Sequence, residues 1–471
     1  MTGELPRAAD RSWWLEEALT DPDLGGEPAP ALDRDTTADV VVVGGGYTGL
    51  WTAWFLKERE PDLDVILLEQ DICGGGPSGR NGGFVNAFYD ETELLVDRWG
   101  DSGARTAALA ARSIDEIGAW CTQQYVDAWF TRSGNLAVST SAAQDAAVEE
   151  ALDTAARYGF DDAYRPLDAG EVRERFDSPV ARRGIDVTHA ATVQPARLAR
   201  GIRRALLERG VRIHERTPVR RFAARPNVAA DTPGGVVRAG RAILGLNAWA
   251  VGWRRFRRTI MVRGTYIVMT APAPDRLERL RWTGGEGVYD FLTAVHYLRT
   301  TPDGRIAFGG AGIRVAPQRI TSRYRYDDRS VAGLVEDFRR WFPTFRDIPL
   351  EAAWGGPVDV SGWHLPFFGT LPGGRAHYGL GFTGNGVGPC HLAGKILAGL
   401  ALDAEDEATT LPLVDVEPKR FPPEPLFTPG ERLVSHAILR KERLEQAGRR
   451  PDPLTNTLAH LPRRLGYNLG P

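Results

Sequence analysis

Lysine is scarce in this chain of 471 residues, in which Lys57, Lys395, Lys419 and Lys441 are the only four. Arginine carries almost all of the positive charge. No lysine lies between residues 58 and 394, where most substrate-binding residues are expected. A substrate site in that interval must therefore work without a lysine ammonium group.

Other absences exclude whole classes of protein. The three cysteines are scattered without a C-x-x-C pair, so neither a disulfide framework nor a metal site is predicted. No window approaches about 18 uninterrupted apolar residues, the length that a membrane-spanning helix needs. The N-terminus is acidic and has no apolar signal core, which favours a cytoplasmic protein. A net charge of −3 argues against a nucleic-acid partner.

The most informative stretch is ADVVVVGGGYTGLWTAWFLKEREPDLDVILLEQ, residues 38–70. The β-branched run near its start is typical of a strand buried on both faces of a parallel sheet. Gly44, Gly46 and Gly49 follow in a G-x-G-x-x-G pattern, then a helix and a second apolar strand that ends at Glu69. This order predicts a dinucleotide site, with the pyrophosphate on the helix N-terminus and Glu69 bonded to a ribose.

The middle of the chain predicts a ligand-lining loop, a helical region and a second sheet. The glycine-rich loop DICGGGPSGRNGGFVNAF follows Glu69 directly, as expected where backbone runs closely along a ligand. Helical patterns dominate residues 90–158. Residues 266–270, 293–300 and 306–309 alternate like strands of an antiparallel sheet with one exposed face.

A second landmark lies near the other end, in HYGLGFTGNGVGPCHLAGKILAGLAL. It predicts a strand at 376–380, a glycine-rich turn at 381–388 and a helix at 391–402. The free N–H groups of such a helix start point at an anion or an electron-rich ring. One cradle suffices for a pyrophosphate, so the second helix start suits the isoalloxazine N1–C2=O region of a flavin.

Taken together, these motifs resemble those of the FAD-dependent amine and amino-acid oxidoreductases of the D-amino acid oxidase superfamily. Within it the sequence is most similar to the γ-glutamylputrescine oxidoreductase branch. The matching segments occur in family order between about residues 38 and 400. They are GGGYTG with Glu69, SGRNGGF (78–84), VQPARL (193–198), TPV (217–219), LNAW (246–249), DGRIAFGG (303–310) and GFTGNGVG (381–388).

The resemblance implies an α/β fold in two interleaved parts. A glutathione-reductase-like Rossmann FAD domain is expected from residues 30–90, 188–255 and 352–408. An α+β substrate domain with an antiparallel sheet is expected from residues 91–187 and 256–351. Residues 409–471 are expected to form a C-terminal tail with one helix.

The resemblance also implies a FAD site. The SGRNGG loop would lie against the flavin and its ribityl chain, the Val219 backbone would meet the adenine, and residues 384–387 would cap the pyrimidine end of the ring. The predicted cofactor-binding residues are Gly44, Gly46, Tyr47, Thr48, Gly49, Glu69, Gln70, Gly76, Ser78, Gly79, Arg80, Asn81, Gly82, Gly83, Val219, Asn247, Trp249, Gly381, Gly384, Asn385, Gly386 and Val387.

Two departures from relatives bear on the chemistry. Related enzymes often attach FAD through a histidine in the loop after the ribose acid, or through a cysteine before the late glycine turn. Here the loop carries Asn81 without a histidine, and no cysteine occurs between Cys121 and Cys390, so non-covalent FAD is expected. Some sarcosine-oxidase relatives place a lysine near flavin N5 to assist dioxygen. Our alignment puts Ala307 there, and the electron acceptor, dioxygen or another, stays open.

The expected reaction is the oxidation of a C–N bond in a small amine or amino acid. A hydride passes to flavin N5, and the resulting imine hydrolyses to a carbonyl product. A D-amino acid dehydrogenase or a glycine- or sarcosine-type oxidase is the alternative within the superfamily. A flavin monooxygenase, whose Gly-Asp element is missing from GFTGNGVG, and a flavoprotein without turnover are the alternatives outside it.

Hydride transfer needs no side-chain acid or base, so no catalytic triad is predicted. Arg299 is the natural clamp if the substrate carries a carboxylate, although a structural arginine is the alternative. Packing is likewise the alternative role for each other pocket candidate. The candidates from the presumed substrate domain and its border are Tyr266, Tyr289, Phe291, His296, Tyr297, Arg299 and Trp363.

Overall fold

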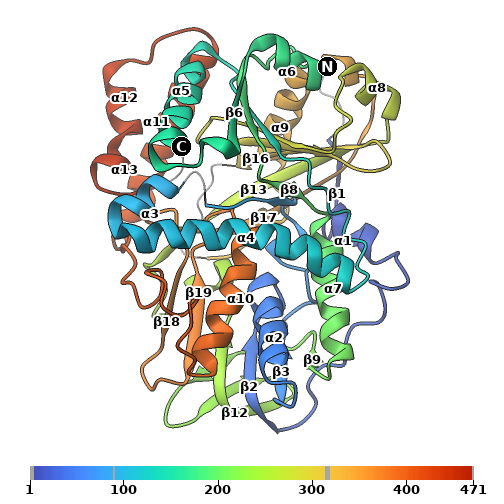
Figure 1. Ribbon diagram of the computed structural model, residues 1–471, viewed down its shortest axis with the longest axis vertical. Helices are drawn as coiled ribbons and strands as arrows, with labels where there is room; N and C mark the ends of the chain where they lie inside the picture. Colours follow the sequence, from blue (N-terminus) through green and yellow to red (C-terminus); the bar gives the residue numbers. More distant parts are fainter. Residues whose placement is uncertain (1–4, 89–90, 313–318, 469–471) are drawn as a thin grey trace.

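The computed structural model describes residues 5–88, 91–312 and 319–468. Two sheets follow one another along the long axis of the molecule, and helix α4 (Asp101–Gln123) crosses between them (Figure 1). Within the described residues, no helix is both long enough and apolar enough to cross a bilayer.

The first sheet is mainly parallel and is called the parallel sheet here. Strand β2 (Thr36–Val43) lies between β3 (Val65–Leu68) and β12 (Gly235–Leu244) and runs parallel to both. The valines 40–43 are buried, as predicted for a strand covered on both faces. The remaining strands are β9 (Arg212–His214), β10 (Arg221–Ala223), β11 (Val228–Thr232), β18 (Phe367–Thr370) and β19 (Ala376–Leu380).

Three helices form a layer on one face of the parallel sheet (Figure 1). They are α2 (Tyr47–Arg59), α7 (Pro195–Glu208) and α10 (Val387–Ala401). Helix α2 is packed by both of the others, so residues 47–57 are all buried. Helix α10 begins four residues before the predicted start, because Gly386 is its N-cap.

The second sheet has nine strands and is mainly antiparallel. The predicted strands of residues 266–309 are its β13, β15 and β16. The predicted domain boundary at residue 352 falls inside β17, which pairs with β13 over nearly its whole length. In spatial order the strands are β1 (Arg7–Ala8), β17 (Leu350–Ser361), β13 (Ile260–Thr270), β16 (Ile306–Gly312), β15 (His296–Thr300), β14 (Gly287–Asp290), β5 (Asn135–Val138), β7 (Gly184–Val187) and β6 (Tyr164–Leu167).

The two faces of the nine-stranded sheet have different neighbours. One face packs against α9 (Asp328–Trp341), where Phe308 joins a cluster of buried aromatic rings. The other face lies against the glycine-rich loop that follows β3. There Trp354 Nε1 donates to Arg80 O at 2.9 Å, and Phe84 packs edge-on against Tyr297. We call this second face the loop-side face.

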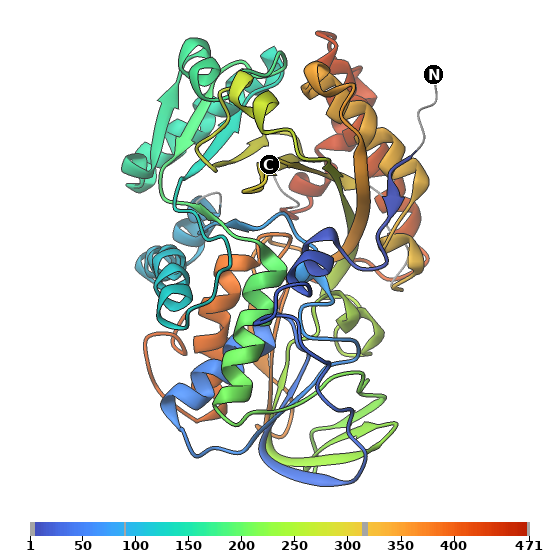
Figure 2. The same ribbon diagram turned by 90° about the vertical axis from the view of Figure 1, so that its right-hand side faces the viewer.

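Both ends of the described chain pack on the nine-stranded sheet. Figure 2 shows the N-terminal segment along the sheet edge, where β1 pairs with β17. The tail contains α11 (Phe427–Gln446), α12 (Pro453–Ala459) and α13 (Leu461–Arg464), where one helix was predicted. A separate helix α12 begins after α11 for a local reason, because Asp452 caps it by accepting the Thr455 N–H at 3.0 Å.

The remaining helices surround the nine-stranded sheet and the boundary between the two sheets. They are α1 (Trp13–Ala18), α3 (Thr92–Trp99), α5 (Ala142–Tyr158), α6 (Ala169–Arg175) and α8 (Pro274–Arg279). A short ladder joins β4 (Phe84–Val85) to β8 (Ala191–Thr192), which links the glycine-rich loop to the segment before α7.

His296 is buried on the α9 side of the nine-stranded sheet, between two carboxylates. Its Nδ1 lies 2.7 Å from Asp290 Oδ2, and its Nε2 lies 3.2 Å from Asp337 Oδ2. Burial alone lowers the pKa of His296, but Asp290 and Asp337 outweigh it and raise the pKa to about 10. The imidazolium therefore ties β15 to α9.

We expect the free energy of unfolding to fall as the pH rises from 6.5 to about 10, because His296 holds a proton in the folded protein that the unfolded chain releases. The stabilisation is complete below pH 6.5 and lost above about pH 10. Urea unfolding followed by far-UV circular dichroism at several pH values measures it. His296→Gln should lack this part of the pH dependence, and equal slopes in both proteins would contradict the assignment.

Candidate functional site

The first glycine turn joins β2 to α2 and leaves the start of α2 open. Gly46 is the N-cap and has no side chain to cap the helix, and within the described residues only the first N–H of α2, that of Tyr47, is bonded by a side chain, through Ser78 Oγ. Gly44 has a φ of 113°, and a Cβ there would lie 2.4 Å from Gly245 O. A Cβ on Gly49 would lie 2.0 Å from Gly44 O. Only glycine fits these positions, and the first N–H groups of α2 face a space that an anion suits.

Glu69 directly follows β3 and lies beside this turn. Its Oε2 accepts the Gly45 N–H at 2.7 Å, and its Oε1 accepts the Asp71 N–H at 2.8 Å. Burial raises the pKa of Glu69 to about 7. These bonds fix the carboxylate where it can accept hydroxyl donors from a ribose. The next residue, Gln70, is exposed.

The TPV segment lies beside Glu69, because Thr217 N–H donates to Glu69 O at 2.7 Å. Val219 and Trp249 are both half-buried against the apolar cluster of the parallel sheet. The Trp249 ring also faces Gly76, whose Cβ position lies 3.8 Å from it. The structure thus brings the predicted adenine and ribityl segments to the same end of the parallel sheet as Glu69.

The loop after β3 folds back over the start of α2. Ser78 Oγ accepts the Tyr47 N–H at 2.8 Å. A Cβ on Gly79 would lie 2.2 Å from Gly74 O, so this backbone is in close contact with itself. The Tyr47 hydroxyl is directed elsewhere and donates to Pro195 O at 2.7 Å.

Arg80 and Asn81 hold this loop in shape. Burial lowers the pKa of Arg80 to about 10, and its guanidinium is occupied by the carbonyls of Asp10, Arg11, Gly75 and Gly355. Asn81 Nδ2 donates to two loop carbonyls, while its Oδ1 accepts the Gly83 N–H at 2.7 Å. Both side chains therefore position the loop backbone, including Gly82 and Gly83, through which the loop would meet a ligand.

The second glycine turn joins β19 to α10. Gly386 is the N-cap of α10, again without a capping side chain, and Gly381 and Gly384 have φ values of 82° and 89°. Asp359 on β17 is fully buried behind this turn. Its Oδ2 accepts the Gly381 N–H at 2.6 Å, and its Oδ1 accepts Asn247 Nδ2 at 2.9 Å. Burial raises the pKa of Asp359 to about 7.

The two glycine turns lie next to each other in space. Thr48 Oγ1, in the first turn of α2, lies 3.3 Å from Cys390 Sγ, in the first turn of α10. Asn385 Nδ2 donates to Ala87 O at 3.0 Å, which joins the second turn to the end of the glycine-rich loop. Val387 is the first residue of α10 and is buried. Two positive helix starts therefore converge on one space.

Aromatic residues border this space on the loop-side face. Phe84 packs edge-on against Tyr289 and Tyr297, with ring centres 6.4 and 6.1 Å apart. Tyr297 Oη lies 2.6 Å from Thr265 Oγ1, and burial raises the pKa of Tyr297 to about 12. Phe291 packs with Tyr289 in the neighbouring apolar cluster. Tyr289 and Tyr297, along with Phe291, are therefore the pocket candidates that the structure brings together.

The other pocket candidates lie elsewhere. Tyr266 and His296 are on the α9 side of the sheet, where the Tyr266 hydroxyl donates to Arg323 O at 2.8 Å. Strand alternation places them opposite Thr265 and Tyr297, so they do not line the same space. Trp363 stacks against the Arg98 guanidinium, whose Cζ lies 3.8 Å from the centre of the Trp363 ring. His364, next to it, lies 3.1 Å from Glu91 Oε1.

Arg299 shares the loop-side face with Tyr297 but its guanidinium is engaged by the backbone. It donates to Val193 O and to Thr300 O, and only 3% of the residue is exposed. Burial lowers the pKa of Arg299 to about 9. These contacts make it a positioning residue beneath Gly83 and leave the predicted carboxylate clamp without support.

Two of the buried acids that escaped the sequence analysis hold segments around the glycine turns. One is Asp359, described above. The other is Glu215, which binds Arg200 and Arg203 at 3.1 Å and accepts the N–H groups of Cys73 and Ala29. Two arginines one helical turn apart, followed by an acid at the end of the next strand, are the signal that would have found this cluster. The cluster holds the loop after β3 against α7.

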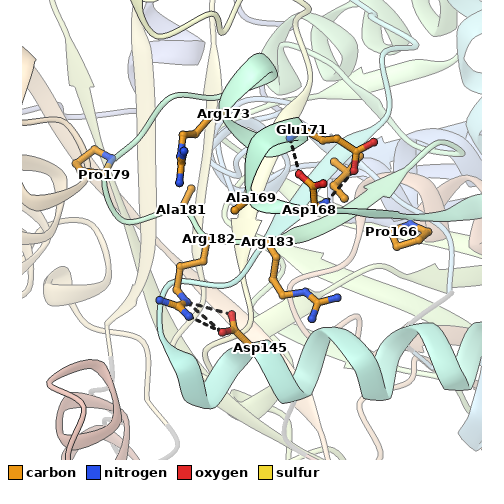
Figure 3. A pocket seen from close by; sticks show the side chains of 11 residues that line it. Asp145, Pro166, Asp168, Ala169, Glu171, Arg173, Pro179, Ala181, Arg182 and Arg183 are labelled. Carbon is orange, nitrogen blue, oxygen red and sulfur yellow. Dashed lines mark hydrogen bonds and ion pairs between the residues drawn. The ribbon is translucent and has the colours of Figure 1, made fainter.

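A separate surface hollow lies at the outer edge of the nine-stranded sheet (Figure 3). It measures about 750 Å³. Most of its charged groups are engaged, since Arg182 binds Asp145 at 2.7 Å, Arg183 binds Glu149 at 2.6 Å, and Asp168 caps α6. It offers no link to the glycine turns.

The glycine turns, Glu69 and the aromatic face define a class of protein, a dinucleotide-binding oxidoreductase with a separate substrate sheet. The residues fit FAD, because Cβ atoms would close the cradle and because both helices have a glycine N-cap, which brings no side chain of its own to their first N–H groups. The profile of the DAO family, described as FAD dependent oxidoreductase, matches residues 39–400. The chain belongs to this family, which confirms the predicted family and the predicted cofactor.

Individual relatives agree with this assignment. Gamma-glutamylputrescine oxidoreductase of Escherichia coli is 29% identical over 377 residues, covering 79% of this chain and 85% of that protein. The oxidoreductase OrdL of Rhizobium meliloti is 27% identical over 446 residues, covering 92% and 96%. The crystal structure of glycine oxidase from Geobacillus kaustophilus shares the fold, with a TM-score of 0.67 at 20% identity, covering 79% and 96%.

We expect Gly46→Ala to weaken FAD retention at least about tenfold, which corresponds to about 1.4 kcal/mol. The new Cβ would lie 2.9 Å from Ser78 Oγ, the atom that accepts the Tyr47 N–H. Flavin absorbance per mole of protein after dialysis measures the loss. The control is Gly333→Ala in α9, where a Cβ meets nothing within 4 Å. Equal flavin content in both variants would contradict the cradle.

We expect Asp359→Asn to release FAD more readily and to lower stability by about 1–3 kcal/mol. The carboxylate accepts from two donors, and an amide leaves one of them facing its own N–H₂ group. Flavin content and denaturant unfolding measure both effects. Asp35→Asn, which removes an exposed charge bound to Arg238, is the matched control. An unchanged holoenzyme after Asp359→Asn would show that this carboxylate does not hold the turn.

Proposed function

We propose that the protein oxidises a C–N bond in an amine or amino acid, giving an imine that hydrolyses to a carbonyl product and ammonia or a smaller amine. The observation that carries this proposal is the aromatic face formed by Phe84, Tyr289 and Tyr297 against the glycine-rich loop. When bound, FAD supplies the hydride acceptor at flavin N5. The chain itself binds and orients the substrate and excludes water.

The aromatic surroundings favour the neutral amine, which is the form that donates hydride. A lysine-like amine with a pKa of about 10.4 costs roughly 4–5 kcal/mol to deprotonate at pH 7. Enclosure by aromatic rings disfavours the ammonium ion and reduces this cost. Tyr297 stays protonated, because burial raises its pKa to about 12, and its hydroxyl beside Thr265 is placed to orient the nitrogen.

We infer that FAD is held without a covalent bond. All three cysteines are buried. Burial raises the pKa of Cys121 and of Cys390 to about 12, and raises that of Cys73 as well. Such thiols are poor nucleophiles near neutral pH. The loop of residues 71–88 contains no histidine.

The relatives guide the choice of substrate and acceptor. The E. coli relative, named for γ-glutamylputrescine, supports an amine of that kind, and D-amino acids and N-methyl amino acids are the alternatives. Ala307, aligned with the oxygen-assisting lysine, is buried beside Met269 and Trp354. Lys57 and Lys395 are bound elsewhere, to the Leu63 carbonyl and to Glu116. The acceptor we propose is one that needs no lysine at this position.

An anaerobic screen tests the proposal. Polyamines, γ-glutamylated amines, N-methyl amino acids, aminophosphonates and D-amino acids are mixed with holoenzyme while visible flavin absorbance is followed. We expect at least one amine to bleach the flavin, with a rate that rises up to about tenfold per pH unit below the pKa of that amine, because only the neutral form reacts. If no compound in the panel bleaches the flavin, the amine-oxidation proposal is wrong.

The same measurement separates the other classes. A flavin monooxygenase would be reduced by NADPH, and stopped-flow mixing with NADPH should instead leave this flavin oxidised. A flavoprotein without turnover would keep its FAD oxidised with every amine and amino acid. If NADPH alone bleaches the flavin, the protein is a flavin monooxygenase. If no compound bleaches it, the protein is a flavoprotein without turnover.

A further inference from the structure

Arg263 carries two hydrogen-bond donors that no residue in the described part of the chain accepts. It lies two residues before Thr265 on β13, so its side chain is on the same loop-side face. Its Nε and Nη2 are buried without a hydrogen-bond partner. Its strand neighbour Val358 lies against the second glycine turn, at 3.9 Å from the Cβ position of Gly384. Arg263 therefore belongs to the same space as the two glycine turns.

The unused atoms form one edge of the guanidinium. Nε–H and Nη2–H point in parallel, and a carboxylate takes such a pair with its two oxygens. Two buried donors without partners are costly, so an arrangement of this kind points to a ligand that fills it. Arg299, by contrast, has its guanidinium on backbone carbonyls.

Helix α11 crosses the loop-side face close to Arg263. At its start, Phe427 packs with Met261 and Val360, which lie on β13 and β17. Near its end, Glu442 Oε1 accepts the Thr293 N–H at 2.7 Å, in the turn between β14 and β15. The helix therefore spans from one side of the loop-side face to the other.

The inner side of α11 carries two carboxylates. Glu431, Ser435, Ile438 and Glu442 are spaced by four, three and four residues, which places them on one side of a helix. Ser435 Oγ donates to Glu431 Oε1 at 2.5 Å and orients that carboxylate. Glu442 is only 7% exposed. The charges of both acids act on Arg263, and neither acid forms an ion pair with it.

Glu431 and Glu442 act on the charge of Arg263, but its Nε–H and Nη2–H donors stay without a partner among the described residues. Burial lowers the pKa of Arg263, while the charges of Glu431 and Glu442 oppose that shift. A ligand carboxylate on Arg263 would stand next to these two acids. A positive group on the same ligand, directed toward α11, would compensate the negative charges of Glu431 and Glu442.

We propose that Arg263 and the inner side of α11 form a subsite for a zwitterionic, amino-carboxylate end of the substrate. Arg263 binds the carboxylate, and Glu431 with Glu442 binds the ammonium group. This rests on the proposed function and narrows its substrate class to amines that also carry an amino-acid group. The subsite depends on a helix outside residues 39–400, so it is a feature of this chain beyond the matched family region.

Three compounds that differ at one end test the subsite in holoenzyme. They are 1,4-diaminobutane with an N-γ-glutamyl, an N-succinyl or an N-acetyl group, which are zwitterionic, anionic and neutral at that end. Thermal shift gives binding, and anaerobic flavin reduction gives the dissociation constant and the limiting rate separately. We expect the γ-glutamyl compound to bind at least 100-fold more tightly than the acetyl compound, with the succinyl compound between them.

Arg263→Gln should remove most of this preference, so that the γ-glutamyl compound loses more affinity than the acetyl compound. Arg263→Lys keeps the charge without the fork and should recover only part of it. In Glu442→Gln the amide oxygen can still accept the Thr293 N–H. This variant should bind the γ-glutamyl compound about tenfold more weakly, with a smaller loss for the succinyl compound. Arg238→Gln, which removes an exposed arginine elsewhere, should match the wild type.

Equal binding of the three compounds to the wild type, or equal losses for all three in Arg263→Gln, would overturn the subsite. So would the absence of any thermal shift with the γ-glutamyl compound. In each of these cases another amine that bleaches the flavin would leave the proposed function standing. Failure of every amine to reduce the flavin would remove both.

Discussion

The structure depends on one close contact, the packing of α2 against α10 with both helix starts at the same end of the parallel sheet. Each start presents unpaired N–H groups and a partial positive charge. Placing two such ends together disfavours the empty site and favours a ligand with a phosphate at one end and an electron-rich ring at the other. FAD meets that requirement, and the glycines at both turns make room for it.

Buried charges then hold the segments that surround this contact. Glu215 joins the loop after β3 to α7 and to the N-terminal segment, and Asp359 joins the second glycine turn to Asn247. Arg80 ties the glycine-rich loop to β17 through carbonyl groups alone. Each contact links parts of the chain that are far apart in sequence. At Glu215, which is paired with two arginines, removing one partner costs more than the pair contributes, because the other charge stays buried.

The nine-stranded sheet separates packing from recognition by its two faces. On the α9 side, Phe308, Trp341 and the His296 network stabilise the sheet. On the loop-side face, Tyr297, Thr265 and Arg263 stand next to the glycine turns. The tail helix α11 extends this face and brings two acids to it. Binding of the cofactor and selection of the substrate are therefore placed on opposite walls of one space.

The sequence alone determined the parts that rest on local geometry. The G-x-G-x-x-G turn, Glu69, the late glycine turn and the alternating strands follow from short-range steric and periodic rules, and they led to the family and to FAD. The role of a side chain on a strand was harder to predict. Tyr266 and His296 are aromatic residues on strands of the same sheet as Tyr297, yet strand alternation directs their side chains toward α9.

Only the tertiary structure decided which charged groups are engaged and which are free. Arg299 and Arg263 are both arginines on strands of one sheet, β15 and β13, and nothing local distinguishes them. Arg299 meets backbone carbonyls from a distant segment, whereas two donors of Arg263 meet none. The placement of Asp359 behind Gly381 and of α11 across the sheet is likewise set by contacts between distant segments. Such contacts are decided by packing of the whole chain, which short-range rules do not contain.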